Sequence, residues 1–252
     1  MKLIEEQGFQ YYQTGKGPVI ILMHGLFGAL SNFYDFIRYF ENKFTIYLPV
    51  LPVYSLPAQE TSIDGMVNYL SDFINFKALK DFSILGNSLG GHIALLYCLK
   101  HQDRVKSLVL TGSSGLFENA LGDSYPRKSD YDYVRKKAAY TFYNPDVATD
   151  DLVDEIYEIV NDKEKAMRIL HLAKSALRHN LSASLSVLTI PVLLIWGKED
   201  RITPPRAGEE FHKLLPNSEL YYLDKCGHAP MMERPKEFNK VTESFFDRIN
   251  RK

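Results

Sequence analysis

The chain has 252 residues, of which 45% are hydrophobic and 24% charged, and its formal net charge is -1 at pH 7. This length and composition are typical of a globular protein with one sizeable core, and they exclude a mainly disordered chain. The small net charge gives no electrostatic reason to expect binding to nucleic acid or to an anionic membrane surface. Any preference for a substrate must therefore come from the residues of its binding site and not from the net charge of the protein.

The N-terminus and the cysteines bear on where the protein works. Residues 1–8 contain no apolar segment followed by small residues, and no later run approaches the roughly 18 apolar residues of a membrane span. The two cysteines, Cys98 and Cys226, are too few for a secreted disulfide framework. We therefore expect a cytoplasmic protein without a membrane span. Cys98 is expected to be a buried core residue, whereas Cys226 beside His228 is a weak candidate for a thiol nucleophile.

Apolar runs alternate with helical spacing along the first half of the chain. The strands are expected at 2–13, as a hairpin, and at 19–23, 44–48, 82–85 and 105–110, with helices at 31–40, 61–76 and after residue 88. The continuous apolar run at 19–23 is typical of a strand that is buried on both faces. This order of elements predicts an α/β fold with a mostly parallel sheet and helices on both of its faces.

Between residues 116 and 188 the strand pattern disappears. Helical segments are expected at 131–140, 150–160 and 163–178, and strands resume at 192–196 and 220–223, with a closing helix at 238–249. We predict one core built from residues 1–115 and 189–252, with a helical cap inserted at 116–188.

Ser88 lies between an apolar strand and a helical pattern, in the segment Gly86-Asn87-Ser88-Leu89-Gly90. Glycines two positions before and after the serine allow a strand to turn abruptly into a helix, and this turn exposes the serine. Serine is also a common helix cap, and the pentapeptide by itself occurs by chance. The strand before Ser88 and the helix after it favour a nucleophile at this position.

A serine nucleophile needs a base, and the base needs a group that fixes its tautomer. Among the seven histidines, His228 follows a late strand in a Gly-His-Ala-Pro loop. Asp200 ends the loop after the strand at 192–196, and the order Ser88, Asp200, His228 is that of enzymes with this serine turn. The weaker candidates for the acid are Glu199 and Asp224. The histidines expected to hold loops by local hydrogen bonds are His24 and His92.

A tetrahedral intermediate also needs hydrogen-bond donors for its oxyanion. The backbone N–H of Leu89, directly after Ser88, is one candidate. The second is expected from the loop His24-Gly25-Leu26-Phe27-Gly28, with the N–H of Leu26 as first choice and that of Phe27 as the alternative.

Four segments together resemble the α/β-hydrolase superfamily, in the same order and over nearly the whole chain: residues 24–28, 86–91, 196–204 and 226–235. The resemblance implies an α/β-hydrolase fold with an eight-stranded, mostly parallel sheet, helices on both faces and an inserted helical cap. It also implies a Ser-His-Asp triad that works without a metal or cofactor. The substrate pocket is expected to include Phe27, Asn87, Ala229 and Met231.

We expect a serine hydrolase of small to medium carboxylic esters that forms an acyl-enzyme. The serine turn and the loop at 196–200 are also similar to those of the meta-cleavage-product hydrolases, which cleave carbon-carbon bonds. Those enzymes typically carry a cap arginine and an aromatic residue after the histidine, whereas Ala229 follows His228 here and residues 154–158 contain no arginine. Arg168 or Arg178 are possible substitutes. A third alternative is a ligand-binding receptor of the same fold with slow turnover, and no pattern indicates an oligomeric state.

Overall fold

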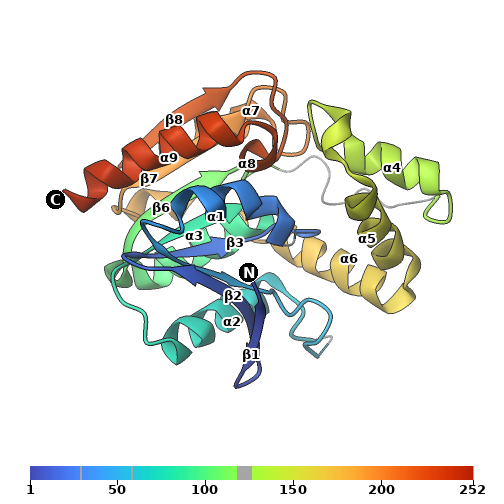
Figure 1. Cartoon of the computed structure of the whole chain (residues 1–252), viewed down its shortest axis with the longest axis horizontal. Coiled ribbons are helices and arrows are strands. Elements are labelled where there is room, and N and C mark those ends of the chain that lie inside the picture. The colour runs from blue at the N-terminus through green and yellow to red at the C-terminus, as the bar shows by residue number, and fades with distance from the viewer. Residues whose placement is uncertain (29, 58, 118–126, 252) are drawn as a thin grey trace.

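The continuous apolar runs form the central strands of one eight-stranded sheet (Figure 1), in a computed structural model that describes residues 1–28, 30–57, 59–117 and 127–251. The strand order is β1-β2-β4-β3-β5-β6-β7-β8. The strands are β1 (Leu3–Glu6), β2 (Phe9–Gly15), β3 (Val19–Met23), β4 (Thr45–Pro49), β5 (Phe82–Asn87), β6 (Val105–Thr111), β7 (Val192–Gly197) and β8 (Ser218–Leu223). Strands β3 to β8 run parallel, whereas β1 and β2 form an antiparallel hairpin against β4. The predicted mostly parallel sheet is confirmed.

Helices cover both faces of this sheet. The helices of the described chain are α1 (Tyr34–Phe40), α2 (Ile63–Phe76), α3 (Leu89–His101), α4 (Tyr131–Ala139), α5 (Asp150–Asn161), α6 (Lys163–Leu177), α7 (Pro205–Leu214), α8 (Pro230–Glu233) and α9 (Pro235–Asn250). Buried side chains of α2, α3 and α7 share one hydrophobic cluster, and those of α1 and α9 share another. The sheet therefore lies between two separate apolar layers.

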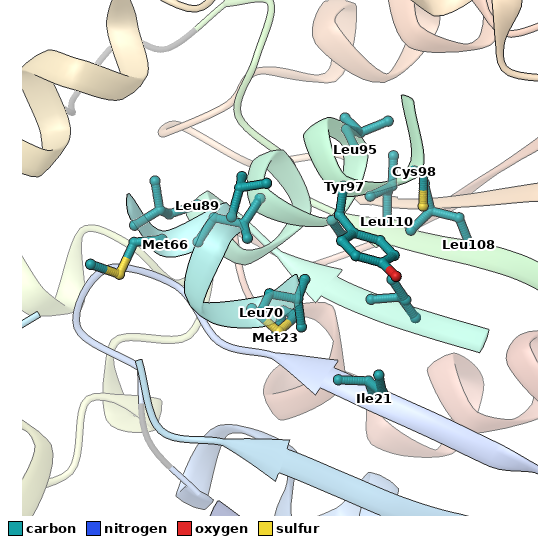
Figure 2. Close-up of a cluster of buried hydrophobic side chains, with 14 of the residues drawn as sticks. Ile21, Met23, Met66, Leu70, Leu89, Leu95, Tyr97, Cys98, Leu108 and Leu110 are labelled. Atoms are coloured by element: carbon teal, nitrogen blue, oxygen red, sulfur yellow. The ribbon is translucent and has the colours of Figure 1, made fainter. Parts of the chain in front are cut away.

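Side chains of each central strand alternate between the two apolar layers. In β3, Ile21 and Met23 belong to the cluster with α2 and α3, whereas Ile20 and Leu22 belong to the cluster with α1 and α9. Successive side chains of a strand point to opposite faces, so a strand covered on both sides must be apolar at every position. Figure 2 shows the first layer, in which side chains of β3, α2, α3 and β6 meet.

The described residues between β6 and β7 form helices and turns and no strand, as predicted. Helices α4, α5 and α6 lie together at one side of the molecule (Figure 1), and α5 contacts both of the others. Their first turns are capped by the side chains of Asp130, Thr149 and Asp162, which accept backbone N–H hydrogen bonds. We call residues 127–188 the helical segment; residues 118–126 of the predicted cap lie outside the described part, and the division into core and cap remains a prediction. Of the described helices, none is long and apolar enough to cross a membrane.

The parallel strands bring distant parts of the sequence to one edge of the sheet. The loops that begin at His24, Ser88, Gly112 and Lys198 follow the carboxyl ends of β3, β5, β6 and β7, and the loop of His228 follows β8. Open α/β sheets bind their ligands at this edge. The residues singled out from the sequence therefore meet at one place.

Candidate active site

Ser88 has a backbone conformation that residues other than glycine rarely adopt. Its φ is 54° and its ψ is -121°, and it directly precedes the first residue of α3. The turn is possible because the residues two positions before and after Ser88 have no side chains: a Cβ on Gly90 would lie 2.2 Å from the carbonyl oxygen of Met23, and one on Gly86 would lie 2.6 Å from the Cα of Gly91. These contacts explain why the predicted turn needs glycine on both sides of Ser88.

Asp200 holds the ring of His228. Its Oδ2 lies 2.9 Å from Nδ1 of His228, and both side chains are almost completely enclosed. The same carboxylate accepts hydrogen bonds from the N–H groups of Ile202 and Thr203 at 2.8 and 3.0 Å and from the Thr203 hydroxyl at 2.9 Å. Because a carboxylate accepts at Nδ1, the neutral ring carries its proton there and leaves Nε2 able to accept one.

Asn87 connects the serine turn to the histidine loop. Its side-chain amide donates to the backbone carbonyls of Thr111, at 3.0 Å, and His228, at 3.1 Å. Gly112 fits beneath the ring, since a Cβ at this position would lie 2.8 Å from Nδ1 of His228. Asn87 at the end of β5 and Gly112 after β6 therefore help to set the position of His228.

The two expected oxyanion donors belong to segments that adjoin Ser88. Leu89 is the first residue of α3, where a backbone N–H has no partner within the helix. The loop at 24–28 lies against Ser88: a Cβ on Gly25 would be only 3.3 Å from the Cβ of Ser88. Leu26 lines the cavity at Ser88, while its role as a donor remains a prediction.

His24 and His92 hold loops, as expected from the sequence. Nδ1 of His24 lies 2.8 Å from the carbonyl of Gly25, and its Nε2 accepts from the N–H of Leu51 at 3.2 Å. Burial lowers the pKa of His24 and so favours its neutral form. Nδ1 of His92 lies 3.4 Å from the hydroxyl of Ser114, and burial lowers the pKa of His92 to about 4.

The alternative site residues have other contacts. Glu199 accepts a hydrogen bond from the N–H of Cys226 at 2.9 Å, and Asp224 pairs with Lys198 at the surface. Cys226 is fully buried, and burial raises the pKa of its thiol, which disfavours the thiolate that a nucleophile needs. Arg168 donates to the carbonyl of Leu56 and to the hydroxyl of Thr61, so it ties the helical segment to the loop after β4.

A cavity of about 400 Å³ opens between the sheet edge and the helical segment. Ser88 and His228, which are 7% and 6% exposed, both line it. So do the predicted pocket residues Phe27, Asn87 and Ala229. Most of the remaining lining is apolar, and its apolar side chains come mainly from three regions: Ala138 and Phe142; Leu152, Ile156, Ile159 and Val160 of α5; and Ala166, Met167, Ile169, Leu170 and Ala173 of α6. Three lysines also line the cavity: Lys128, Lys137 and Lys163.

One predicted pocket residue lies elsewhere. Met231 is buried in the apolar layer with α1 and α9, and its neighbour Met232 lines the cavity in its place. The two residues belong to α8, where successive side chains point about 100° apart because a turn holds about 3.6 residues. No pattern in the sequence indicates a helix directly after the histidine loop, so nothing local distinguishes Met231 from Met232 as the residue that faces the cavity.

Three residues that contact Asp200 or the histidine loop were not predicted: Thr203 donates to Asp200, and Glu233 and Thr141 accept from the histidine loop. Thr203 follows Asp200 by three residues, a spacing at which an aspartate commonly accepts hydrogen bonds from the backbone ahead of it, so this contact had a local signal. Glu233 accepts from the N–H of Gly227 at 2.7 Å, and the carbonyl of Thr141 accepts from the N–H of His228 at 2.9 Å. Thr141 lies 87 positions before His228, and no local pattern relates them.

Known proteins share this architecture. A model of the alpha/beta hydrolase family matches residues 20–241. The chain is similar to a solved alpha/beta hydrolase enzyme from the metagenome of lagoon sediments at Mar Chica, Morocco, with 39% identity, a TM-score of 0.82 and coverage of 99% of this chain and 100% of that one. It is 28% identical to a 2-hydroxy-6-oxo-6-(2'-aminophenyl)hexa-2,4-dienoic acid hydrolase of Metapseudomonas resinovorans, over 95% of this chain and 87% of that protein. It is also 28% identical to a pimeloyl-[acyl-carrier protein] methyl ester esterase of Nitrosomonas europaea, over 89% and 94% of the two chains.

Proposed function

Because the chain belongs to the alpha/beta hydrolase family, we propose that it is a serine hydrolase that cleaves small to medium carboxylic esters through an acyl-enzyme. The observation that carries the proposal is the contact of 2.9 Å between Asp200 and His228 behind a cavity that both His228 and Ser88 line. The two relatives named above differ in their reactions: one is named as a dienoic acid hydrolase and the other as a methyl ester esterase. For this chain, the lining of the cavity favours ester hydrolysis.

In this mechanism the Ser88 hydroxyl attacks the ester carbonyl carbon while Nε2 of His228 takes its proton. Asp200 keeps the proton of Nδ1 in place and stabilises the imidazolium that forms. The N–H groups of Leu89 and Leu26 donate to the oxyanion, each worth about 3 to 4 kcal/mol to the transition state. His228 then protonates the departing alcohol, and a water activated by the same ring releases the acid and regenerates Ser88.

The lining of the cavity supports an apolar acyl group. Six residues of α6 line it, at spacings that place them on one face of the helix, from Lys163 to Ala173. Ten residues of helix span about 15 Å, which is room for an extended acyl chain. Along this face the side chains become more enclosed, from Met167, which is 61% exposed, to Ala173, which is 1% exposed. We infer that the chain lies along α6 and that its carbonyl end lies beyond Ala173.

The proposal is tested with purified protein and p-nitrophenyl esters from acetate to decanoate. Wild-type protein should hydrolyse them, and Ser88→Ala should lose nearly all turnover, while the exposed Ser244→Ala keeps it. A fluorophosphonate should label the wild type and not Ser88→Ala. Equal turnover in Ser88→Ala would overturn the assignment. A wild type that stays unlabelled while ligands raise its Tm would instead indicate a receptor of the same fold.

Carbon-carbon bond hydrolysis is the second candidate, because the relative from Metapseudomonas resinovorans is named for a dienoic acid substrate. Against it, the described residues that line the cavity include no arginine, and Arg168 is engaged with the loop after β4. A coloured dienoic diketone decides between the two. Fading of its colour at a rate above that of the esters would favour the carbon-carbon reaction.

A further inference from the structure

The backbone of the histidine loop is held at three successive N–H groups by three different parts of the molecule. Cys226 donates to the carboxylate of Glu199 at 2.9 Å, Gly227 to Oε1 of Glu233 at 2.7 Å, and His228 to the carbonyl of Thr141 at 2.9 Å. Thr141 belongs to the helical segment, whereas Glu199 follows β7 and Glu233 lies in α8. The position of His228 therefore depends on the helical segment as well as on the sheet.

Glu233 contacts both sides of this junction. While its Oε1 accepts from Gly227, its Oε2 accepts from the N–H groups of Tyr143 and Asn144, at 2.7 and 3.3 Å. One carboxylate thus bridges the histidine loop and the turn that follows α4. Burial raises the pKa of Glu233, and the three N–H groups act in the opposite direction by stabilising its charge.

The two backbones that Glu233 joins are in direct contact. A Cβ on Gly227 would lie 2.7 Å from the carbonyl oxygen of Thr141 and 2.8 Å from the nitrogen of Tyr143. Only a glycine permits this approach. The helical segment consequently cannot shift toward or away from the loop without disturbing hydrogen bonds of Gly227 or His228.

The same turn also faces the cavity. Tyr140, Thr141 and Phe142 line it, next to residues that bind Glu233. A ligand in the cavity therefore touches the stretch of chain that holds the loop of His228.

We propose that Glu233 is a positioning residue that docks residues 141–144 of the helical segment onto the loop of His228, so that His228 is correctly placed only while this docking is intact. The kinetic side of this inference rests on the proposed ester hydrolysis. Glu233 touches no reacting atom and acts through the backbone of Gly227. An error of about 1 Å in the placement of a catalytic group costs on the order of 100-fold in rate. Turnover should therefore fall strongly when residues 141–144 no longer hold the loop of His228 in place.

The first test is Glu233→Gln with Glu237→Gln as the matched control, since Glu237 is an exposed residue of α9 that pairs with Arg234. A glutamine turns an NH₂ group toward one of the two sets of N–H donors, so one side of the bridge is lost. We expect kcat to fall about 10- to 100-fold with KM nearly unchanged, and fluorophosphonate labelling of Ser88 to slow by the same factor. The control should match the wild type. A Glu233→Gln protein with a lower Tm and unchanged kcat would show a purely structural role and overturn the proposal.

The second test needs neither a variant nor activity. In the wild-type protein, backbone amide hydrogen exchange of Gly227, His228, Tyr143 and Asn144 should show one common level of protection, because docking and undocking open them together. Modification of Ser88 by an alkyl fluorophosphonate should raise the protection of all four. Rapid exchange of Tyr143 and Asn144 beside a protected Gly227 and His228 would refute the docking. A protein without esterase activity would refute the proposed function and leave this measurement valid.

Discussion

The side-chain amide of Asn87 donates a hydrogen bond to the backbone carbonyl of His228, 3.1 Å away. The residue before the proposed nucleophile thus contacts the residue proposed as its base, although 141 positions separate them in the chain. The serine turn and the histidine loop are therefore fixed relative to one another by a group that takes no part in the proposed reaction.

Asn87→Ala is expected to lower both turnover and stability. The substitution leaves the carbonyl of His228 without this donor, and a buried carbonyl without a partner costs about 1–3 kcal/mol. The free energy of unfolding in urea should fall by that amount with an unchanged m-value, and kcat for a p-nitrophenyl ester should fall about 10-fold, which corresponds to about 1.4 kcal/mol. Asn217→Ala is the control, because its amide donates to a carbonyl at the surface. Wild-type kcat in Asn87→Ala would contradict a role in positioning His228.

Thr203→Val tests the support of Asp200. The hydroxyl of Thr203 donates to the carboxylate oxygen that contacts His228, whereas the valine has a similar shape and no donor. A hydrogen bond to a charged group is worth about 1.5–3 kcal/mol, so kcat should fall at least several-fold while KM changes little. Thr14→Val removes a similar donor to the carboxylate of Glu41, on β2 away from the cavity, and should leave kcat unchanged. Equal kinetics for the two variants would show that Thr203 is dispensable.

Ala166→Phe and Ala173→Phe test the direction of the acyl chain along α6. Ala173 lies toward the end of α6 that is nearer to Ser88. After this end, the backbone N–H of Leu181 donates to the carbonyl of Gly115 at 2.8 Å. The N–H of Ser114, next to Gly115, donates to the carbonyl of Ser88 at 3.2 Å. A ring at position 166 should therefore lower kcat/KM for decanoate about 10-fold and spare acetate, because a lost pocket for a few methylenes is worth about 1–3 kcal/mol. A ring at position 173 should also affect the shorter chains. Identical chain-length profiles for both variants would argue against this orientation.

His92 should make the stability of the protein depend on pH. Its pKa is lowered by burial from 6.5 to about 4, so the unfolded chain binds a proton in this range and the folded protein does not. Above pH 6.5, His92 is neutral in both states and does not affect the free energy of unfolding. As the pH falls from 6.5 toward 4, the unfolded chain gains a proton that the folded protein does not bind, so the free energy of unfolding falls. The free energy of unfolding of the wild type should therefore fall relative to that of His92→Gln by up to about 1.4 kcal/mol per pH unit. His171→Gln, at an exposed position on α6, should keep the wild-type slope, and parallel curves for His92→Gln and the wild type would contradict the prediction.

Local patterns in the sequence determined much of the architecture. Continuous apolar runs such as residues 19–23 predicted strands buried on both faces, because side chains that alternate between two apolar layers must all be apolar. Glycines at 86 and 90 predicted the turn at Ser88, because the steric limits that they relieve lie within a few residues. Ser88, Asp200 and His228 could be selected because each lies at the end of a strand or in the loop after one, in the chain order of enzymes with this serine turn.

Contacts between distant loops could be decided only by the tertiary structure. The choice between Met231 and Met232 depended on the rotation of α8, and the contacts of Glu233 with Tyr143 and Asn144 depended on where the helical segment meets the sheet. A sequence states which groups can donate and accept, whereas their pairing depends on distances that folding sets between residues about 90 positions apart. The sequence by itself therefore determined the sheet, the serine turn and the candidate residues, and the tertiary structure decided which backbone groups hold them.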